Sequence, residues 1–224
     1  MHVILNIDTA TEQGIVAVSG NDAVLAKRIN LNQKDHAGWV HVAIEEVINE
    51  SGHTLNELAA IAVVGGPGSY TGLRVGMATA KGLSYALNIP LIQLNTLVLM
   101  ARAAITTTTY NKEVLYCPMI DARRMEVFTA LYDNTLKEIL APCAMVLGKD
   151  SFSELTGKHA ILFFGNGSEK WKSLAGDNAL FSEVHYTDFE IAWLSGKEFE
   201  MAAFANIAYA EPVYLKEFYT PVKQ

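Results

Sequence analysis

Two aspartates could take part in chemistry, because each closes a short apolar run that we predict to be a strand. Asp8 ends the first such run, and Asp121 ends the run that opens the second half of the chain. In folds that clamp a nucleotide, carboxylates at strand ends hold Mg²⁺ and orient a phosphate group or a water molecule. An aspartate in this position can equally accept backbone hydrogen bonds within its own turn, which is the interpretation we prefer. Thr9 and Thr11 fit either interpretation.

A glycine-rich segment at residues 65–72 connects a predicted strand to a predicted helix. Backbone amides at such a junction can bind an anion. The segment is not a P-loop, because no Gly-Lys-Ser/Thr follows, and it lacks the third glycine of GxGxxG, where Thr71 stands. A purely structural turn is the alternative. The strand-end and loop residues together form a candidate degenerate nucleotide site: Asp8, Thr9, Thr11, Gly68, Ser69 and Asp121.

The histidines do not form a metal-ligand pattern. His36 and His41 are five residues apart on a predicted helix, so they are rotated by about 140° and lie on different faces. Helical metal ligands usually stand three or four residues apart. HExxH and GxSxG are both missing from the sequence. We therefore expect neither a metal site nor a hydrolase constellation.

The helix after the glycine-rich segment has an unusually bare face. Gly76, Ala80 and Ser84 recur every fourth residue, which brings them to one side of the helix. Small side chains let another backbone approach closely. The neighbour could be a second subunit or the protein's own sheet, and the spacing does not decide between them.

The elements that position these residues occur in the same order twice. Three predicted strands, with an aspartate at the end of the first, precede alternating helices and strands in residues 1–108 and again in residues 109–224. The segments 6–9 and 119–122 correspond in this repeat. The pattern by itself indicates an α/β fold with an internal repeat. The order resembles the duplicated actin-like (ASKHA, ribonuclease H-like) fold, with two lobes that each hold a mixed sheet flanked by helices.

The composition of the chain argues against several classes of protein. The chain has 224 residues, of which 50% are hydrophobic, and its formal net charge is −7. This acidity opposes direct binding to a nucleic acid, so we expect a partner to hold any RNA. Two cysteines are too few for a disulfide framework. We find no secretory leader and no membrane span, and we expect a cytoplasmic protein.

Two long segments carry a family resemblance. GGPGSYTGLRVGMATAKGLSYAL at residues 65–87 and ILNIDTATEQGIVAV at residues 4–18 resemble the signatures of the TsaB (YeaZ) family. Weaker matches are PLIQLNT, IDARRMEVFTALY and the C-terminal PVYLK. The sequence departs from the family pattern at Gly14-Ile15, at Tyr70 and at Lys216. The resemblance extends over essentially the whole chain.

The resemblance implies a non-catalytic dimerisation and activating subunit in the biosynthesis of threonylcarbamoyladenosine at position 37 of tRNA. Its implied partners are a TsaD-like transferase, which it activates, and a TsaE-like ATPase, with a homodimer when it is alone. It implies that the protein contacts tRNA only through the complex, that it does not contact a membrane and that it needs no cofactor. Weak binding of ATP or ADP is left undecided. A small actin-like ATPase or kinase using Asp8 and Asp121 is the alternative.

In the family, the partner contact uses the helices of the first lobe, which correspond here to residues 36–50 and 73–87. The bare helix face then becomes a docking surface. The interface residues that this implies are Trp39, Val40, Leu73, Arg74, Gly76, Met77, Ala80, Lys81 and Ser84.

Overall fold

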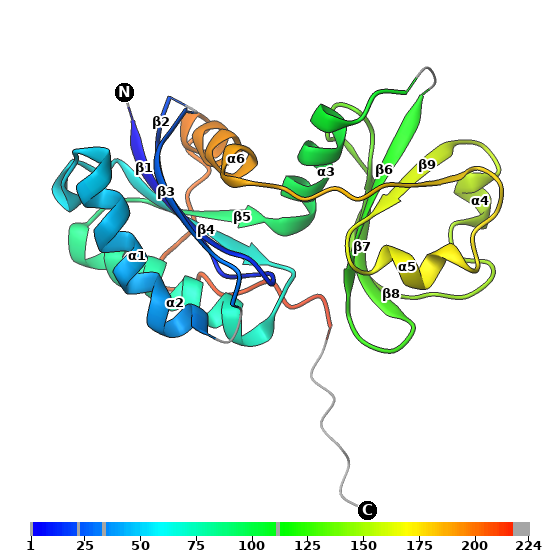
Figure 1. Cartoon of the computed structure of the whole chain (residues 1–224), viewed down its shortest axis with the longest axis horizontal. Coiled ribbons are helices and arrows are strands. Elements are labelled where there is room, and N and C mark those ends of the chain that lie inside the picture. The colour runs from blue at the N-terminus through cyan, green and yellow to red at the C-terminus, as the bar shows by residue number, and fades with distance from the viewer. Residues whose placement is uncertain (1, 22, 33–34, 111–112, 217–224) are drawn as a thin grey trace, which may run out of the picture.

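The computed structural model describes residues 2–21, 23–32, 35–110 and 113–216. The chain forms two lobes, each with a five-stranded sheet (Figure 1). No helix within the described ranges has the length and apolar character that a membrane crossing requires.

The first sheet has the strand order β3-β2-β1-β4-β5. Its central strand β1 pairs antiparallel with β2 and parallel with β4, so the sheet is mixed. Apolar side chains fill both faces of β1, β2 and β4, which are buried along their whole length. The five strands are β1 (Val3–Asp8), β2 (Gly14–Gly20), β3 (Ala23–Asn30), β4 (Ala60–Gly66) and β5 (Leu91–Asn95).

Helices cover both faces of this sheet. One face packs against α1 (His36–Ser51) and α2 (Tyr70–Leu87) around side chains such as Leu5 and Val63. The other face packs against α3 (Thr96–Thr107) and against α6 (Asp188–Glu200) from the far end of the chain. A short 3-10 turn, η2 (Leu55–Glu57), precedes β4.

Local signals in the sequence set the helix ends. Gly52 ends α1 with a φ of 72°, a left-handed conformation that glycine adopts without strain. The Ser69 side chain accepts a hydrogen bond from the Gly72 amide and caps the start of α2. Asn95 does the same for α3 through the amides of Leu97 and Val98.

The second sheet repeats this topology with the order β10-β9-β6-β7-β8. Its central strand β6 pairs antiparallel with β7 and parallel with β9, as β1 does with β2 and β4. The strands are β6 (Val114–Asp121), β7 (Glu126–Tyr132), β8 (Glu138–Val146), β9 (Ala160–Phe164) and β10 (Ala179–Phe181). The predicted duplicated two-lobe α/β fold is therefore confirmed.

A smaller core covers the outer face of the second sheet. Phe152, Phe163 and Trp171 pack edge to face and tilted against one another there. Trp171 belongs to α5 (Ser168–Lys172), and Phe152 precedes α4 (Ser153–Thr156). The inner face of this sheet joins the core around α3, which connects the two lobes.

Three segments differ from what their sequence patterns predict, namely strands at residues 136–140 and 181–186 and a helix at residues 190–208. The first of these strands begins later, at Glu138, and extends past Pro142 to Val146, because β8 is an edge strand and needs no amide on its free side. The predicted strand 181–186 pairs only at its start, since residues 182–187 cross between the lobes. The predicted helix 190–208 ends at Glu200.

The end of the chain returns to the first lobe. Helix α6 contacts β1, β2, β3 and β5, and Ala205 forms an antiparallel bridge with Leu91 of β5. The order of elements along the chain places these residues in the second half, because local patterns do not show which sheet a late helix will cover. The boundary at residues 108 and 109 stays a prediction.

Candidate functional site

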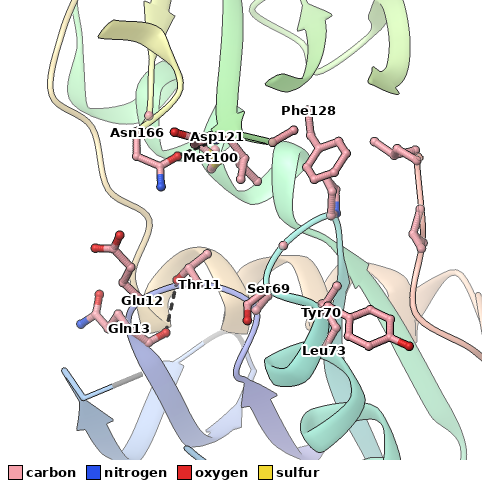
Figure 2. Close-up of a pocket in the computed structure, with 18 of the residues that line it drawn as sticks. Thr11, Glu12, Gln13, Ser69, Tyr70, Leu73, Met100, Asp121, Phe128 and Asn166 are labelled. Atoms are coloured by element: carbon pink, nitrogen blue, oxygen red, sulfur yellow. Dashed lines mark hydrogen bonds between the residues drawn. The ribbon is translucent and has the colours of Figure 1, made fainter. Parts of the chain in front are cut away.

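A cavity with a volume of about 1160 Å³ lies between the two lobes (Figure 2). The glycine-rich loop of the first lobe reaches it, and so does the loop after β9 of the second lobe through Gly165 and Asn166. Most of its wall comes from six segments: residues 10–13 and 67–71 of the first lobe, 120–123 and 165–166 of the second, the crossing segment 184–186, and the tail 213–216. Single side chains of Ile15, Leu31, Leu73, Met100 and Phe128 complete it.

Asp8 is buried behind the cavity wall formed by Ala10 and Tyr186, and each of its carboxylate oxygens accepts a hydrogen bond. Its Oδ1 accepts the amide of Ala10 at 2.8 Å, and its Oδ2 accepts the hydroxyl of Tyr186 at 2.7 Å. Burial raises the pKa of Asp8 from its ordinary 3.8 to about 6, and these two hydrogen bonds lower it only in part. The same burial raises the pKa of Tyr186 well above its usual value.

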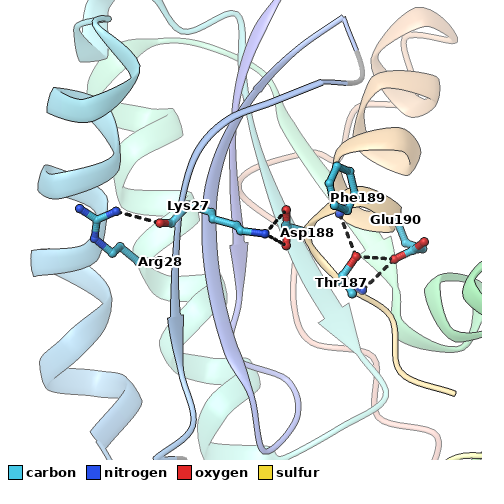
Figure 3. A network of polar contacts seen from close by, with 6 residues as sticks. All are labelled: Lys27, Arg28, Thr187, Asp188, Phe189 and Glu190. Carbon is cyan, nitrogen blue, oxygen red and sulfur yellow. Dashed lines mark hydrogen bonds and ion pairs between the residues drawn. The ribbon is translucent and has the colours of Figure 1, made fainter. Parts of the chain in front are cut away.

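The start of α6 fixes Tyr186 over Asp8. Thr187 caps α6 in a reciprocal capping box with Glu190. The next residue, Asp188, is buried and forms an ion pair at 2.8 Å with Lys27 on β3 (Figure 3). These contacts tie the crossing segment to the first lobe directly beside Tyr186.

The glycine-rich loop packs on the turn that follows Asp8. The amide of Ser69 donates to the carbonyl of Ala10 at 2.7 Å, and Thr9 Oγ1 donates to the carbonyl of Gly72 at 2.7 Å. A Cβ atom on Gly68 or Gly72 would collide with the backbone of this turn. The glycines are therefore needed for close packing of the loop against the turn.

Asp121 has a different environment from Asp8, although it forms the same kind of turn. Its Oδ1 accepts the amide of Arg123 at 2.5 Å, as Asp8 accepts an amide two residues later. It also pairs with Lys170 at 2.6 Å, and this ammonium group lowers the pKa of Asp121. The backbone amide of Asp121 donates to the side chain of Asn166 at 2.9 Å.

The structure thus separates the predicted nucleotide-site residues. Thr11, Gly68 and Ser69 line the cavity from the first lobe and Asp121 lines it from the second, whereas Asp8 and Thr9 are buried behind its wall. Thr11, on the cavity wall, donates to the carbonyl of Gln13 at 3.3 Å. Across the described ranges, no group of three or more His, Cys, Asp or Glu side chains is arranged to hold a metal ion. Sequence reasoning missed Tyr186 and Lys170, because neither has a local signal for its aspartate partner.

The bare face of α2 packs inside its own lobe. Ala80 and Ser84 are completely buried. A Cβ atom on Gly76 would lie 2.5 Å from Oγ1 of Thr9 and 3.4 Å from Val63. The prediction that this face docks a partner is therefore wrong, because the small residues let the helix approach β1 and β4.

The other predicted interface residues divide into three groups. Val40, Leu73 and Met77 are buried in the core. Two basic residues of α2 contact the chain's own tail: Lys81 Nζ donates to the carbonyl of Ala210, and Arg74 Nε donates to the hydroxyl of Tyr214. Trp39 is half-buried beside Gly14. Docking on a different face of these helices stays a prediction.

The outward face of α2 carries a second row of small residues that sequence reasoning overlooked. Ala78, Gly82 and Ala86 also recur every fourth residue, and all three are exposed. A Cβ atom on Gly82 would meet nothing within 4 Å. The spacing was equally visible in the sequence, but only the packing distinguishes the two rows.

The repeated sheet topology and the cavity between the lobes define a two-lobed protein of the actin-like class. A family model described as "TsaD: tRNA N6-adenosine threonylcarbamoyltransferase" matches residues 24–210. The chain is 32% identical to the tRNA threonylcarbamoyladenosine biosynthesis protein TsaB of Bacillus subtilis over 78% of this chain and 75% of that protein. For TsaB of Escherichia coli, the identity is 30% over 95% and 94% of the two chains. The protein belongs to the TsaB (YeaZ) family.

The solved structure of YeaZ from Pseudomonas aeruginosa has the same fold. Its TM-score is 0.76 at 23% identity, and the match covers 96% of this chain and all of that one. The similarity extends over both lobes, so the two-lobed arrangement is shared as a whole.

Proposed function

We propose that this protein is a non-catalytic subunit that binds and activates a TsaD-like transferase in the biosynthesis of tRNA threonylcarbamoyladenosine. The names of its relatives support the pathway. The non-catalytic role is carried by one observation: both strand-end carboxylates are committed to contacts within the chain.

The contacts of these two carboxylates oppose the alternative of a small ATPase or kinase. Asp8 is completely buried, and each of its oxygens already accepts a hydrogen bond. Asp121 is held by Lys170 and by the amide of Arg123. A magnesium-dependent phosphoryl transfer would need carboxylates that face the ligand. Of the two aspartates only Asp121 lines the cavity, and there it is paired with the ammonium group of Lys170. Calorimetry with Mg-ATP at millimolar concentration tests the alternative, for which tight binding and hydrolysis by the protein alone are required.

The transferase is proposed to dock on the outward faces of α1 and α2. The exposed row Ala78, Gly82 and Ala86 allows another helix to approach the backbone of α2 closely. A shallow groove lies beside it between α1 and α2, with Ile44 and Leu83 in its wall. The same surface would serve a second copy of the chain when the transferase is absent.

The remaining parts of the proposal concern the assembly. A TsaE-like ATPase joins the complex, and tRNA contacts this chain only through its partners, in keeping with the net charge of −7. The protein needs no cofactor of its own. The calorimetry with Mg-ATP also tests whether it binds a nucleotide weakly. We expect it to act in the cytoplasm.

A Gly82→Trp variant tests the docking surface. A Cβ atom at this exposed position meets nothing within 4 Å, and replacing a helical glycine does not lower helix propensity, so we expect the fold to be retained. We expect co-purification with a TsaD-like transferase to be lost, together with the stimulation of tRNA modification in a reconstituted assay. The matched control is Gly176→Trp in the second lobe, where a Cβ atom also meets nothing within 4 Å.

Two results would contradict the proposal. Normal transferase binding by Gly82→Trp would place the interface elsewhere. Full modification activity in an assay that lacks this protein would remove the activating role altogether.

A further inference from the structure

The C-terminal tail follows the edge of the first sheet. The amide of Ala205 donates to the carbonyl of Leu91 on the edge strand β5 at 2.8 Å. Further along, Gln93 Nε2 donates to the carbonyl of Glu211 at 2.9 Å, and Lys81 donates to the carbonyl of Ala210 at 2.7 Å. The tail is therefore fastened along β5 and α2 by both backbone and side-chain contacts.

The tail then passes over the glycine-rich loop at the wall of the cavity. The amide of Val213 donates to the carbonyl of Gly65 at 2.8 Å. The ring of Tyr214 lies 5.6 Å from the ring of Tyr70, and its hydroxyl accepts a hydrogen bond from Arg74. The guanidinium of Arg74 in turn lies over the Tyr70 ring at 4.1 Å.

The described part of the tail ends on the other lobe. The ammonium group of Lys216 forms an ion pair with the carboxylate of Glu126, the first residue of β7. The Lys216 side chain is 50% exposed and that of Glu126 is 16% exposed. An ion pair as exposed as this one is weak and sensitive to salt.

The tail is thus fastened unequally at its two ends. Several hydrogen bonds and the contact between the tilted rings of Tyr70 and Tyr214 hold it to the first lobe, whereas one ion pair holds it to the second. The lobes are also joined by the continuous apolar core around α3 and by the crossing segment 182–187. In Figure 1, that segment and the tail bridge the two lobes on opposite sides of the molecule.

We infer that residues 205–216 form a strap that holds the cavity between the lobes closed, with the Lys216–Glu126 pair as its latch. When the latch releases, the second lobe rotates about the α3 core and the cavity opens. The strap stays attached to the first lobe. This inference does not depend on the proposed function, and it is tested on the isolated protein.

A double-mutant cycle tests the latch. The variants are Lys216→Glu, Glu126→Gln and the two combined, and Glu46→Gln is the matched control because it breaks an exposed ion pair with Arg28 inside the first lobe. Distances between the lobes are measured by electron–electron double resonance with spin labels at positions 49 and 134, which are exposed on α1 and after β7. Cys143→Ser removes the partly exposed native thiol.

We expect the population with a longer distance to increase up to about fivefold in Lys216→Glu, the change that an exposed ion pair can produce. Glu126→Gln should give a smaller increase. In the Glu126→Gln background, Lys216→Glu should add little, because the repelling carboxylate is gone. The control should match the wild type, and 1 M salt should open the wild type without any substitution.

Two outcomes would overturn the strap. One is an unchanged distance distribution in Lys216→Glu and in high salt. The other is an equal effect of Lys216→Glu with and without Glu126, which would show that these residues do not act as a pair.

Discussion

Replacing Asp8 with asparagine should stabilise this protein at neutral pH and remove a specific part of its pH dependence. The pKa of Asp8 is about 6 in the folded chain, against an ordinary value of 3.8. Between these two values, the folded protein retains a proton that the unfolded chain has released. The contribution of Asp8 to the free energy of unfolding is therefore fully present below pH 3.8 and is lost as the pH rises through 6.

The size of the effect follows from the two pKa values. Their difference corresponds to about 3 kcal/mol of stability lost between a pH well below 3.8 and pH 7, of which about 2.4 kcal/mol is lost between pH 4 and pH 7. Asparagine keeps the oxygen that accepts the Ala10 amide and carries no charge to be desolvated. Its amide group can also donate to the hydroxyl oxygen of Tyr186. We therefore expect Asp8→Asn to gain about 2–3 kcal/mol at pH 7 relative to its effect at pH 4.

Denaturant unfolding of both proteins at half-unit steps from pH 4 to pH 8 measures this difference. Subtracting the two curves removes every other titrating group. Asp133→Asn is the control of opposite sign, because hydrogen bonds from Thr135 lower the pKa of this exposed turn aspartate. That variant should show no gain in stability above pH 6.

Parallel curves for Asp8→Asn and the wild type between pH 4 and pH 7 would refute the reasoning. A loss of stability in Asp8→Asn at pH 7 would do so as well, because it would mean that the buried charge is stabilised in the fold. Retained support of tRNA modification by this variant would further agree with a non-catalytic Asp8.

Further predictions concern packing and the attachment of α6. Gly76→Leu should lower the free energy of unfolding by at least about 1–3 kcal/mol, because the new side chain meets Thr9. Gly82→Ala, on the exposed face of the same helix, should raise it by up to about 1 kcal/mol. Denaturant midpoints measure both changes. Equal effects at the two positions would contradict the observed orientation of α2. Lys27→Met leaves the buried Asp188 without its ion pair and should cost about 2 kcal/mol, between the values for exposed and buried pairs (Figure 3). Lys172→Met breaks the exposed ion pair with Glu169 and should change the free energy of unfolding by less than about 0.5 kcal/mol. A similar loss in Lys27→Met and Lys172→Met would count against a special role for Lys27.

Much of the fold could be predicted from the sequence, because its signals are local. The order of apolar runs, the turn aspartates Asp8 and Asp121 and the glycine at the end of α1 each act within a few residues. These signals were enough to recognise that one α/β unit occurs twice. The side chain of each aspartate accepts an amide two residues later, as the structural interpretation expected.

The orientation of α2 needed the tertiary structure. The helix carries two rows of small residues with the same spacing, one through Gly76 and Ala80 and one through Ala78 and Gly82. Spacing places each row on one face, but it does not show which face the sheet will cover. The sheet covers the first row, so the row that the sequence analysis offered to a partner is inside the lobe.

The partners of the candidate site were also decided by the tertiary structure. Tyr186 lies 178 residues from Asp8 in the chain, and Lys216 lies 90 residues from Glu126. No local pattern connects such residues, because each pairing exists only after the crossing segment and the tail have returned to the other lobe. The sequence by itself determined the repeat, the turns and the family, whereas the long-range packing determined which carboxylate is buried, which helix face is free and how the cavity is closed.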